Sequence, residues 1–425
     1  MDRRVGHLHG QPGRARVNSA VSEARPWKAA TLWLIALGAL FFSSYNATNW
    51  LASQRAQVPS IVFAWEAYVP YAPWTIVPYW SIDLFYCISL YVCRTRAELT
   101  TQAWRLLTVQ LISITVFVAA PLRCTFVRPE TTGVLGAMLD ALLAFDKPFN
   151  QAPALHISLL VILWVRFALH LTGAWRWLLH VWFALIGVSV MTTYQHHFFD
   201  IPTGAWLGFF CVWLFPEGAP PLLRGFKLAR DARRRQLALR YLLGGVLTGF
   251  IAVYFGGAWP WLLWLLWPTG ALLLVAAIYA AIGVAGFQKD ERGRMSLANR
   301  VLLAPYLAGA WLNSRWWTRH APAPHSVTPR LWLGRFPARA GDLPAGVTGV
   351  VDLCAELPWH IHVSSYAHVP ALDLVALDRE QLIRAAQSIG EALARGPVLV
   401  CCALGYSRSV ASIAAWLLEI GRAHV

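Results

Sequence analysis

Long apolar stretches without charge constrain this chain more than any other feature of its sequence. Six of them lie at about 29–50, 67–93, 106–122, 150–165, 177–195 and 201–216. A further run at 241–288 is long enough for two more helices. About 20 apolar helical residues cross the hydrocarbon core of a bilayer. The sequence therefore predicts a polytopic α-helical membrane protein with about eight spans. Asp83, inside the second span, is expected to be a helix-packing or conformational residue rather than a catalyst.

The basic residues indicate how these spans are oriented. Only 13% of the residues are charged, yet the net charge is +15. Lys and Arg cluster in five joints, at 1–28, 94–105, 166–176, 224–240 and 289–300. Cytoplasmic joints carry such an excess, so we expect the N-terminus and the C-terminal part to be cytoplasmic in a bacterial inner membrane. No basic face interleaved with aromatic residues is present, which argues against nucleic-acid binding.

Composition changes after the last apolar run. From about residue 328, strand-like segments such as "VTGVVDLC" alternate with helix-like segments such as "REQLIRAAQSIGEALA", which is typical of a soluble α/β domain. The predicted order is a basic N-terminus (1–28), a six-helix membrane unit (29–216), a basic loop (217–240), two further spans (241–288), an interfacial linker (289–327) and the α/β domain (328–418).

The stretch "VLVCCALGYSRSV", residues 398–410, carries the clearest chemistry. A β-rich run ends at Cys402, and Arg408 and Ser409 begin an apolar helix. Five small or neutral residues lie between them, namely Ala403, Leu404, Gly405, Tyr406 and Ser407. Such a loop can turn its N–H groups toward an anion and favour a cysteine thiolate, and Arg408 can bind two phosphate oxygens. A buried structural pair of cysteines is the alternative interpretation.

This spacing resembles the CxxxxxR signature of protein tyrosine and dual-specificity phosphatases. The likeness covers about 328–418, where "LWLGRFP" and "VVDLCAE" resemble the opening strands and "YAHVPALDLVALDREQL" resembles the general-acid loop. The resemblance implies that Cys402 forms a phosphocysteine, while the loop and Arg408 bind phosphate. It also implies that Ser409 helps the thiolate leave and that Asp373, or as second choice Asp378, protonates the leaving oxygen.

The sequence departs from this family's pattern at two places. Cys401 stands where the family has a histidine, and the helix after the loop ends sooner than in the family. The last seven residues, "EIGRAHV" (419–425), equal the in-frame translation of a common sequencing adapter. We therefore expect the natural chain to be longer.

A second group of polar motifs falls on the outer side of the predicted membrane unit. These motifs are "RCTFVRPE" (123–130), "DKPFNQAPALH" (146–156) and "QHHFFD" (195–200). His196 and Asp200 are spaced i, i+4, so on a helix the carboxylate can orient the imidazole. His156 begins the fourth span and can meet them, which would allow phosphoryl transfer without a metal. Taken singly, a histidine at a membrane edge is more often a satisfied polar residue than a catalyst.

In order, these motifs resemble those of the type 2 phosphatidic acid phosphatase superfamily, especially the branch related to inositol phosphorylceramide synthases. The resemblance implies that His196 is the nucleophile, with Asp200 as its partner and His156 as the acid for the leaving alcohol. Three basic residues would hold the phosphate, namely Arg123, Arg128 and Lys147. His197 would face away from Asp200 and be structural.

This second resemblance also has departures. Ala154 occupies the usual serine position of the second motif, and Val190 stands where many members have an arginine. The lysine of the first motif is missing.

Both halves of the chain therefore point to phosphate monoesters. We expect a membrane phosphatase acting on a phospholipid or phosphoprotein substrate, with membrane lipid phosphates the leading class. The seven cysteines form neither a disulfide framework nor a CxxC pair, so no metal or cofactor is expected. Three alternatives stay open: a lipid headgroup phosphotransferase, a protein tyrosine or dual-specificity phosphatase, and a non-catalytic lipid-phosphate binder.

Overall fold

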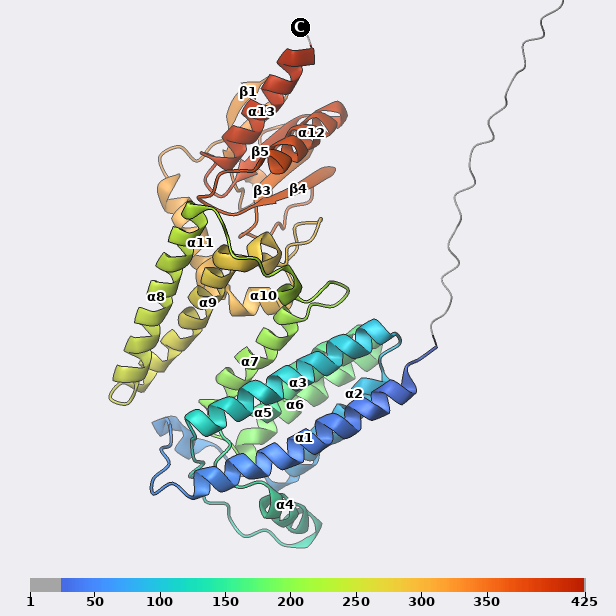
Figure 1. Ribbon diagram of the computed structural model, residues 1–425, viewed down its shortest axis with the longest axis vertical. Coiled ribbons are helices and arrows are strands. Elements are labelled where there is room, and N and C mark those ends of the chain that lie inside the picture. Colours follow the sequence, from blue (N-terminus) through green and yellow to red (C-terminus); the bar gives the residue numbers. More distant parts are fainter. Residues whose placement is uncertain (1–23, 424–425) are drawn as a thin grey trace, which may run out of the picture.

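The computed structural model describes residues 24–423. Most of the predicted basic N-terminus and the last two residues of the adapter-like segment lie outside the described residues. The described chain is elongated, with a bundle of long helices at one end and a five-stranded sheet at the other (Figure 1). It is mostly helical before the sheet begins.

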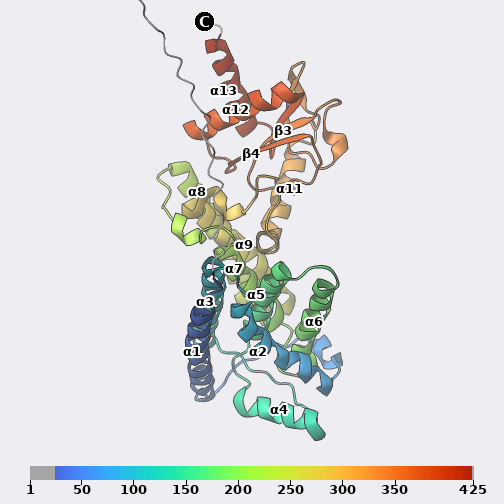
Figure 2. The ribbon, with the colours of Figure 1, turned by 90° about the vertical axis from the view of Figure 1, so that its right-hand side faces the viewer.

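The α-helices that precede the sheet in the described chain are α1 (Trp27–Ser53), α2 (Ile76–Tyr91), α3 (Arg96–Ala119), α4 (Gly133–Phe145), α5 (Leu155–His170), α6 (Gly173–Thr192), α7 (Asp200–Leu214), α8 (Ala232–Gly256), α9 (Leu266–Ala277), α10 (Leu297–Leu302) and α11 (Ala304–Trp317). Shorter helical turns are η1 (Ala64–Tyr68), η2 (Pro73–Thr75), η3 (Leu222–Gly225), η4 (Pro260–Leu265), the π-helical η5 (Ile278–Ile282) and η6 (Gly283–Phe287). Figure 2 shows α1 and α3 side by side along the bundle.

Five segments within residues 24–423 are long and apolar enough to cross a membrane: α1, α3, α6, α8 and the continuous segment Pro260–Phe287. The length and composition of these segments thus indicate a membrane protein. Helices α2, α5 and α7 contain 16, 16 and 15 residues, or about 24 Å of helix against a hydrocarbon core of about 30 Å. The eight-span topology therefore stays a prediction. Helix α4, in the predicted outer joint, was not expected from the sequence.

Helices α5 and α7 approach each other closely because small residues separate them. A Cβ added at Gly204 would lie 2.5 Å from the carbonyl oxygen of Ala154. Ser158 Oγ donates to the carbonyl of Gly204 at 2.8 Å. Such small-residue contacts are a main source of helix association in a bilayer, where the hydrophobic effect between helices is absent. The contact aligns the N-terminal ends of α5 and α7, which carry His156 and Asp200.

Two buried arginines join the opposite ends of these helices. Arg166 of α5 donates from Nη2 to Glu217 Oε2 at 2.9 Å, and Arg105 Nη1 of α3 lies 3.3 Å from the same oxygen. Arg105 also donates to the carbonyl of Phe215 from Nε and Nη2. Ionisable groups in membrane helices are paired in this way because an unpaired charge would be costly. The ends of α3, α5 and α7 are therefore fixed to one another.

The C-terminal part is an α/β domain, as predicted. Its strands are β1 (His325–Thr328), β2 (Leu331–Arg335), β3 (Gly349–Cys354), β4 (Ser365–Ala371) and β5 (Val398–Cys402), and its helices are η7 (Ala340–Asp342), α12 (Arg379–Arg395) and α13 (Arg408–Ala423). The strand order is β1-β2-β5-β3-β4; β1 is antiparallel to β2, and the other pairs are parallel. Every residue of β5 is buried, as expected for the central strand of a covered sheet.

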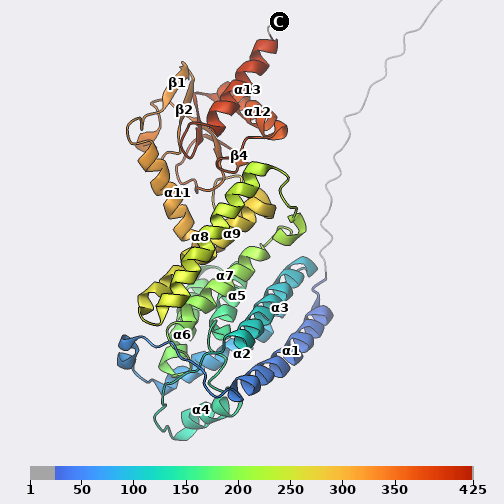
Figure 3. The same ribbon diagram turned by 60° about the vertical axis from the view of Figure 1, so that its left-hand side comes forward.

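The two faces of the sheet have different covers. Helices α12 and α13 lie on one face (Figure 3), where Cys402 packs in a cluster with Ile389 and Ile413. On the other face, Cys401 packs with Phe336 and Trp359. Neighbouring residues of β5 therefore point to opposite faces, which follows from the two-residue period of a strand.

The predicted linker 289–327 contacts the sheet domain at several points. Lys289 Nζ forms an ion pair of 2.6 Å with Asp352 Oδ2 of β3, and both side chains are buried. Trp359 N donates to the carbonyl of Gly293 at 2.8 Å. Helix α11 also contacts the domain, since Ser314 Oγ donates to the carbonyl of Ala403 at 2.5 Å. The domain is thus attached to the last membrane segment by buried polar contacts.

Candidate functional sites

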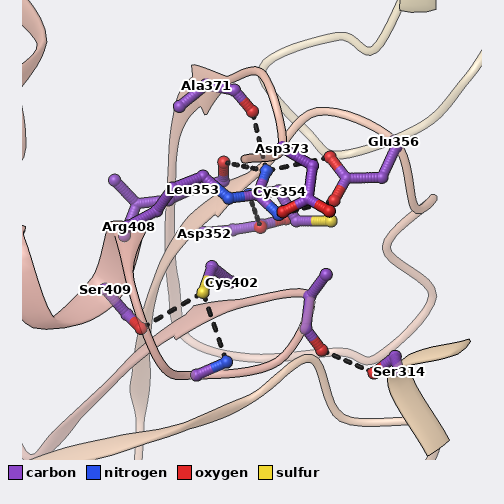
Figure 4. Close-up of polar contacts among 12 residues, drawn as sticks. Ser314, Asp352, Leu353, Cys354, Glu356, Ala371, Asp373, Cys402, Arg408 and Ser409 are labelled. Carbon is purple, nitrogen blue, oxygen red and sulfur yellow. Dashed lines mark hydrogen bonds and ion pairs between the residues drawn. The ribbon is translucent and has the colours of Figure 1, made fainter. Parts of the chain in front are cut away.

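The loop after β5 turns back onto the sulfur of Cys402. Gly405 N donates to Sγ at 3.2 Å, and Ser409 Oγ lies 3.3 Å from Sγ (Figure 4). Ser409 is the second residue of α13, so the sulfur also lies near the positive end of a helix dipole. Cys402 is only 3% exposed. The sulfur of Cys402 thus accepts a backbone hydrogen bond and contacts a hydroxyl at the start of α13.

Gly405 is the one loop residue whose identity the backbone demands. Its φ is +82°, and an added Cβ would lie 2.6 Å from the carbonyl carbon of Gly334 and 2.8 Å from Arg335 N. Side chains other than hydrogen are strained at such a φ. Along the rest of the loop, Ala403 is buried, Leu404 is half-buried, and Tyr406 and Ser407 are exposed.

Arg408 is buried and held by a carboxylate that the sequence prediction missed. Its Nη2 and Nη1 donate to Glu356 Oε1 and Oε2 at 2.6 and 2.9 Å, a bidentate pair (Figure 4). Nη1 also donates to the carbonyl of Ala371 at 2.7 Å. Burial would raise the pKa of the Glu356 carboxyl, but the charge and hydrogen bonds of Arg408 outweigh it and hold that pKa below its ordinary value. Glu356 therefore fixes the position of the guanidinium.

Asp373 lies against the same guanidinium. Its Oδ1 accepts from Arg408 Nη2 at 2.8 Å. Burial, with the negative charge of Glu356 adding to it, raises the pKa of the Asp373 carboxyl despite the opposing charge of Arg408. A raised pKa suits a group that must carry a proton. The second candidate, Asp378, instead caps α12, accepting from Gln381 N at 2.8 Å.

Cys401 occupies a closed position on the opposite face of the sheet. It is paired in register with Gly334 of β2 and Asp352 of β3 and is fully buried. Burial, followed by the nearby negative charge of Asp352, raises the pKa of the Cys401 thiol well above its ordinary value. This thiol is therefore neutral, and its environment differs sharply from that of Cys402.

In the membrane unit, the predicted dyad is formed. His196 Nδ1 lies 3.2 Å from Asp200 Oδ2, and both side chains are buried. Asp200 Oδ2 also accepts from His197 N at 3.0 Å. With its amide oriented by its surroundings, Gln151 donates to the same oxygen at 3.0 Å. The Asp200 carboxylate is thus held in place by two further hydrogen bonds, and it can orient the imidazole of His196.

His156 and His196 line one cavity of about 490 Å³. The ring of His156 stacks on Tyr79 with centroids 4.1 Å apart, and its buried Nε2 has no hydrogen-bond partner among the described residues. Two carboxylates, Asp83 and Asp146, also line the cavity. Most of the other lining residues are apolar or aromatic side chains of α1, α2 and α5, among them Leu34, Phe41, Trp80 and Leu159. The cavity therefore joins a polar end to an apolar space inside the bundle.

The three basic residues expected to hold phosphate lie elsewhere. Arg123 and Lys147 are exposed, and Arg128 pairs with Asp140 of α4 at 2.6 Å. None of the three lines the cavity, and no Lys or Arg occurs among the described residues that do. The structure thus brings together His156, His196 and Asp200, but not the expected phosphate ligands.

The side chain of His197 is paired with groups other than Asp200. Its Nδ1 lies 2.8 Å from Glu66 Oε2 of η1, and its Nε2 lies 3.0 Å from Thr125 N. Glu66 also accepts from Phe198 N at 3.2 Å. No sequence signal pointed to Glu66, because it is a single acidic residue far from the motifs.

A metal centre was not predicted. Within residues 24–423, no group of three or more His, Cys, Asp or Glu side chains could hold a metal ion.

No protein family, no curated protein and no solved structure matches this chain. The two motif resemblances therefore stay predictions.

Proposed function

We propose that this protein is a membrane-bound phosphatase that hydrolyses phosphate monoesters, with lipid phosphates as the leading substrates. The observation that carries the proposal is the loop that follows Cys402: a loop N–H and a hydroxyl contact the sulfur, and the loop ends at a buried arginine that is hydrogen-bonded to a carboxyl of raised pKa. A cysteine placed only for packing has no need of these four groups together.

The proposed cytoplasmic reaction has two steps. The Cys402 thiolate attacks phosphorus, the bond from phosphorus to the leaving oxygen breaks, and Asp373 gives that oxygen its proton. Water then attacks the phosphocysteine, Asp373 takes the proton of water, and inorganic phosphate leaves as the thiolate is restored with help from Ser409. An arriving phosphate would replace Asp373 as the partner of Arg408 Nη2, which frees the Asp373 carboxyl to face the leaving oxygen.

At the membrane site, His196 would be the nucleophile, oriented by Asp200, and His156 the acid for the leaving alcohol. The imidazole attacks phosphorus, the ester bond breaks, and the alcohol leaves with a proton from His156. Water then cleaves the phosphohistidine in the hydrolase. The apolar part of the cavity suits the chain of a lipid whose headgroup lies between the histidines.

One observation favours a second candidate for this site, a lipid headgroup phosphotransferase. The cavity lining holds two carboxylates, Asp83 and Asp146, and among its described residues no Lys or Arg. A phosphate monoester dianion is poorly stabilised there, whereas a phosphodiester carries one charge fewer. In the transferase, a second lipid alcohol instead of water would attack the phosphohistidine.

We further propose that the protein spans a bacterial inner membrane eight times, with its N-terminus and sheet domain in the cytoplasm. The basic joints support this orientation. In a Cys87→Ser background, a cysteine placed at Thr132 should be labelled from outside by a membrane-impermeant maleimide. A cysteine at Ala232 should be labelled only after permeabilisation. The reverse pattern would overturn the orientation.

The function is tested by phosphate release from a phosphatidic acid and from a phosphotyrosyl peptide, measured on the whole protein in detergent. Cys402→Ser should abolish the activity that thiol alkylators inhibit, because serine is a poor nucleophile in a loop built for thiolate. His196→Ala should remove the remaining lipid activity. A product that forms only when a lipid alcohol is added would identify the transferase. Binding of phosphatidic acid without any turnover would leave only the non-catalytic binder.

A further inference from the structure

The loop that carries Asp373 rests on the membrane helices rather than on its own domain alone. Leu372 is buried in a cluster with Trp213 of α7, Leu237 of α8 and Val275 of α9, and Val375 packs against the same cluster. The two ends of the loop are therefore held by apolar contacts with helices outside the sheet domain.

Between these two anchors, the loop backbone accepts two hydrogen bonds from the membrane part. Tyr279 Oη donates to the carbonyl of Asp373 at 3.1 Å, and Arg233 Nε donates to the carbonyl of Leu374 at 3.3 Å. Leu374 has φ +58°, a conformation that a leucine adopts only when its surroundings enforce it. With the backbone held on this side, the Asp373 carboxylate points the other way, to Arg408.

Tyr279 is itself firmly placed. It is 1% exposed and lies in the π-helical turn η5, a type of helix defect that is frequent at functional sites. Its carbonyl accepts from Arg234 Nε of α8 at 3.2 Å, and its ring packs on Tyr241 of α8 with centroids 5.4 Å apart. The position of the tyrosine hydroxyl therefore depends on how η5 packs against α8.

We propose that Tyr279 and Arg233 are positioning residues that hold the acid loop from the membrane side. Turnover at Cys402 then depends on the packing of the last two membrane segments, so the sheet domain reports on the state of the helices to which it is attached. This inference rests on the proposed function of the cytoplasmic site.

A misplaced acid has a recognisable kinetic effect. Protonation matters for a poor leaving group such as phenol and much less for a phenol made acidic by a nitro group. Asp373→Asn should therefore slow phenyl phosphate turnover about 10²-fold or more while affecting 4-nitrophenyl phosphate far less. Tyr279→Phe and Arg233→Gln should show the same selectivity on a smaller scale, about two- to tenfold each, the range of one net hydrogen bond.

The measurement compares kcat for these two substrates in the full-length protein, in a His196→Ala background so that only the cytoplasmic site contributes. Tyr241→Phe and Arg235→Gln are matched controls. Tyr241 belongs to the same aromatic group but bonds to Tyr306, and Arg235 is exposed on the same turn of α8. Both controls should leave the ratio of the two kcat values unchanged.

The outcomes separate this inference from the proposed function. If Cys402→Ser retained turnover of both substrates, the proposed function would fail. Suppose that Cys402→Ser and Asp373→Asn behaved as expected, but Tyr279→Phe lowered kcat for both substrates equally or for neither. The positioning role would then be refuted, and the proposed function would stand. A loss of protein stability would lower kcat for both substrates together. The ratio of the two kcat values therefore distinguishes a loss of stability from a loss of positioning.

Discussion

The bidentate pair between Arg408 and Glu356 should be the strongest single polar contact of the sheet domain. Both side chains are about 2% exposed, and the two hydrogen bonds measure 2.6 and 2.9 Å. Removing one partner of a buried ion pair costs about 3–5 kcal/mol, because the other charge is left buried. In Glu356→Gln, Asp373 remains as a second, partly exposed partner of Arg408. We therefore expect a loss near the lower limit, about 3 kcal/mol.

Buried thiols of the same domain provide the assay. Cys354 and Cys401 are fully buried, and burial raises the pKa of both thiols, so an alkylating reagent reaches them only when the domain opens. A loss of about 3 kcal/mol should raise their native-state labelling rate about a hundredfold. Peptide mass spectrometry of the full-length protein in detergent would resolve both sites. Glu391→Gln, an exposed position on α12, is the matched control and should label like the wild type.

The pH dependence adds a signature that a simple packing defect lacks. The pKa of Glu356 in the folded protein lies below its ordinary value of 4.5, so its contribution to stability is complete above about pH 4.5 and is lost as the pH falls through the folded pKa. The difference in labelling rate between wild type and Glu356→Gln should therefore shrink below about pH 4.5. A labelling rate within threefold of wild type at pH 7 would contradict the reasoning.

Three further predictions concern single residues. Two of these residues lie at the two proposed sites, and the third forms the ion pair between the linker and the sheet domain. Gly405→Ala should distort the loop and lower phosphate release at the Cys402 site at least tenfold, because its Cβ would meet the backbone of β2 at 2.6 Å; Gly341→Ala, in open space, should not. Asp200→Asn should lower lipid turnover at the membrane site by about 10²–10⁴-fold, since the imidazole loses its orienting carboxylate, and should leave phosphopeptide turnover intact. Lys289→Met leaves Asp352 buried without its cation and should destabilise the sheet domain by about 3–5 kcal/mol. The loss is measurable as faster labelling of Cys401. An unchanged labelling rate would show that Tyr366, which donates to the same carboxylate, suffices to stabilise the buried Asp352.

The features that the sequence predicted are those set by local pattern. Apolar runs gave the positions of most long helices, because a helix that faces lipid must be apolar over its whole length. The spacing from Cys402 to Ser409 predicted the strand, loop and helix that surround Cys402. Likewise, the i, i+4 spacing gave the contact of His196 with Asp200. In each case the residues concerned are near neighbours in sequence, so the local backbone conformation brings them together.

Partners distant in sequence were missed. Glu356 follows β3 and meets Arg408, which comes after β5; since these parallel strands are neighbours, their carboxyl ends share one edge of the sheet. That edge could have suggested Glu356, but only after the strand order was known. The pairing of Arg166 with Glu217 shows a different limit. Arg166 was counted among the basic residues of a cytoplasmic joint, whereas its side chain is buried between helices.

The two proposed sites lie at opposite ends of α7, and this placement restricts how they can cooperate. Asp200 begins the helix, while Trp213 near its end belongs to the cluster that holds Leu372 and the acid loop. The turns of α7 between Asp200 and Trp213 span about 20 Å, so the two sites do not share one pocket. What the sites share is therefore the helix itself. Because α7 is held against α5 at Gly204, where even a methyl group would clash with the carbonyl of Ala154, the helix cannot shift toward α5. A change at His196 would therefore reach the loop of Asp373 through a motion of α7 other than a shift toward α5.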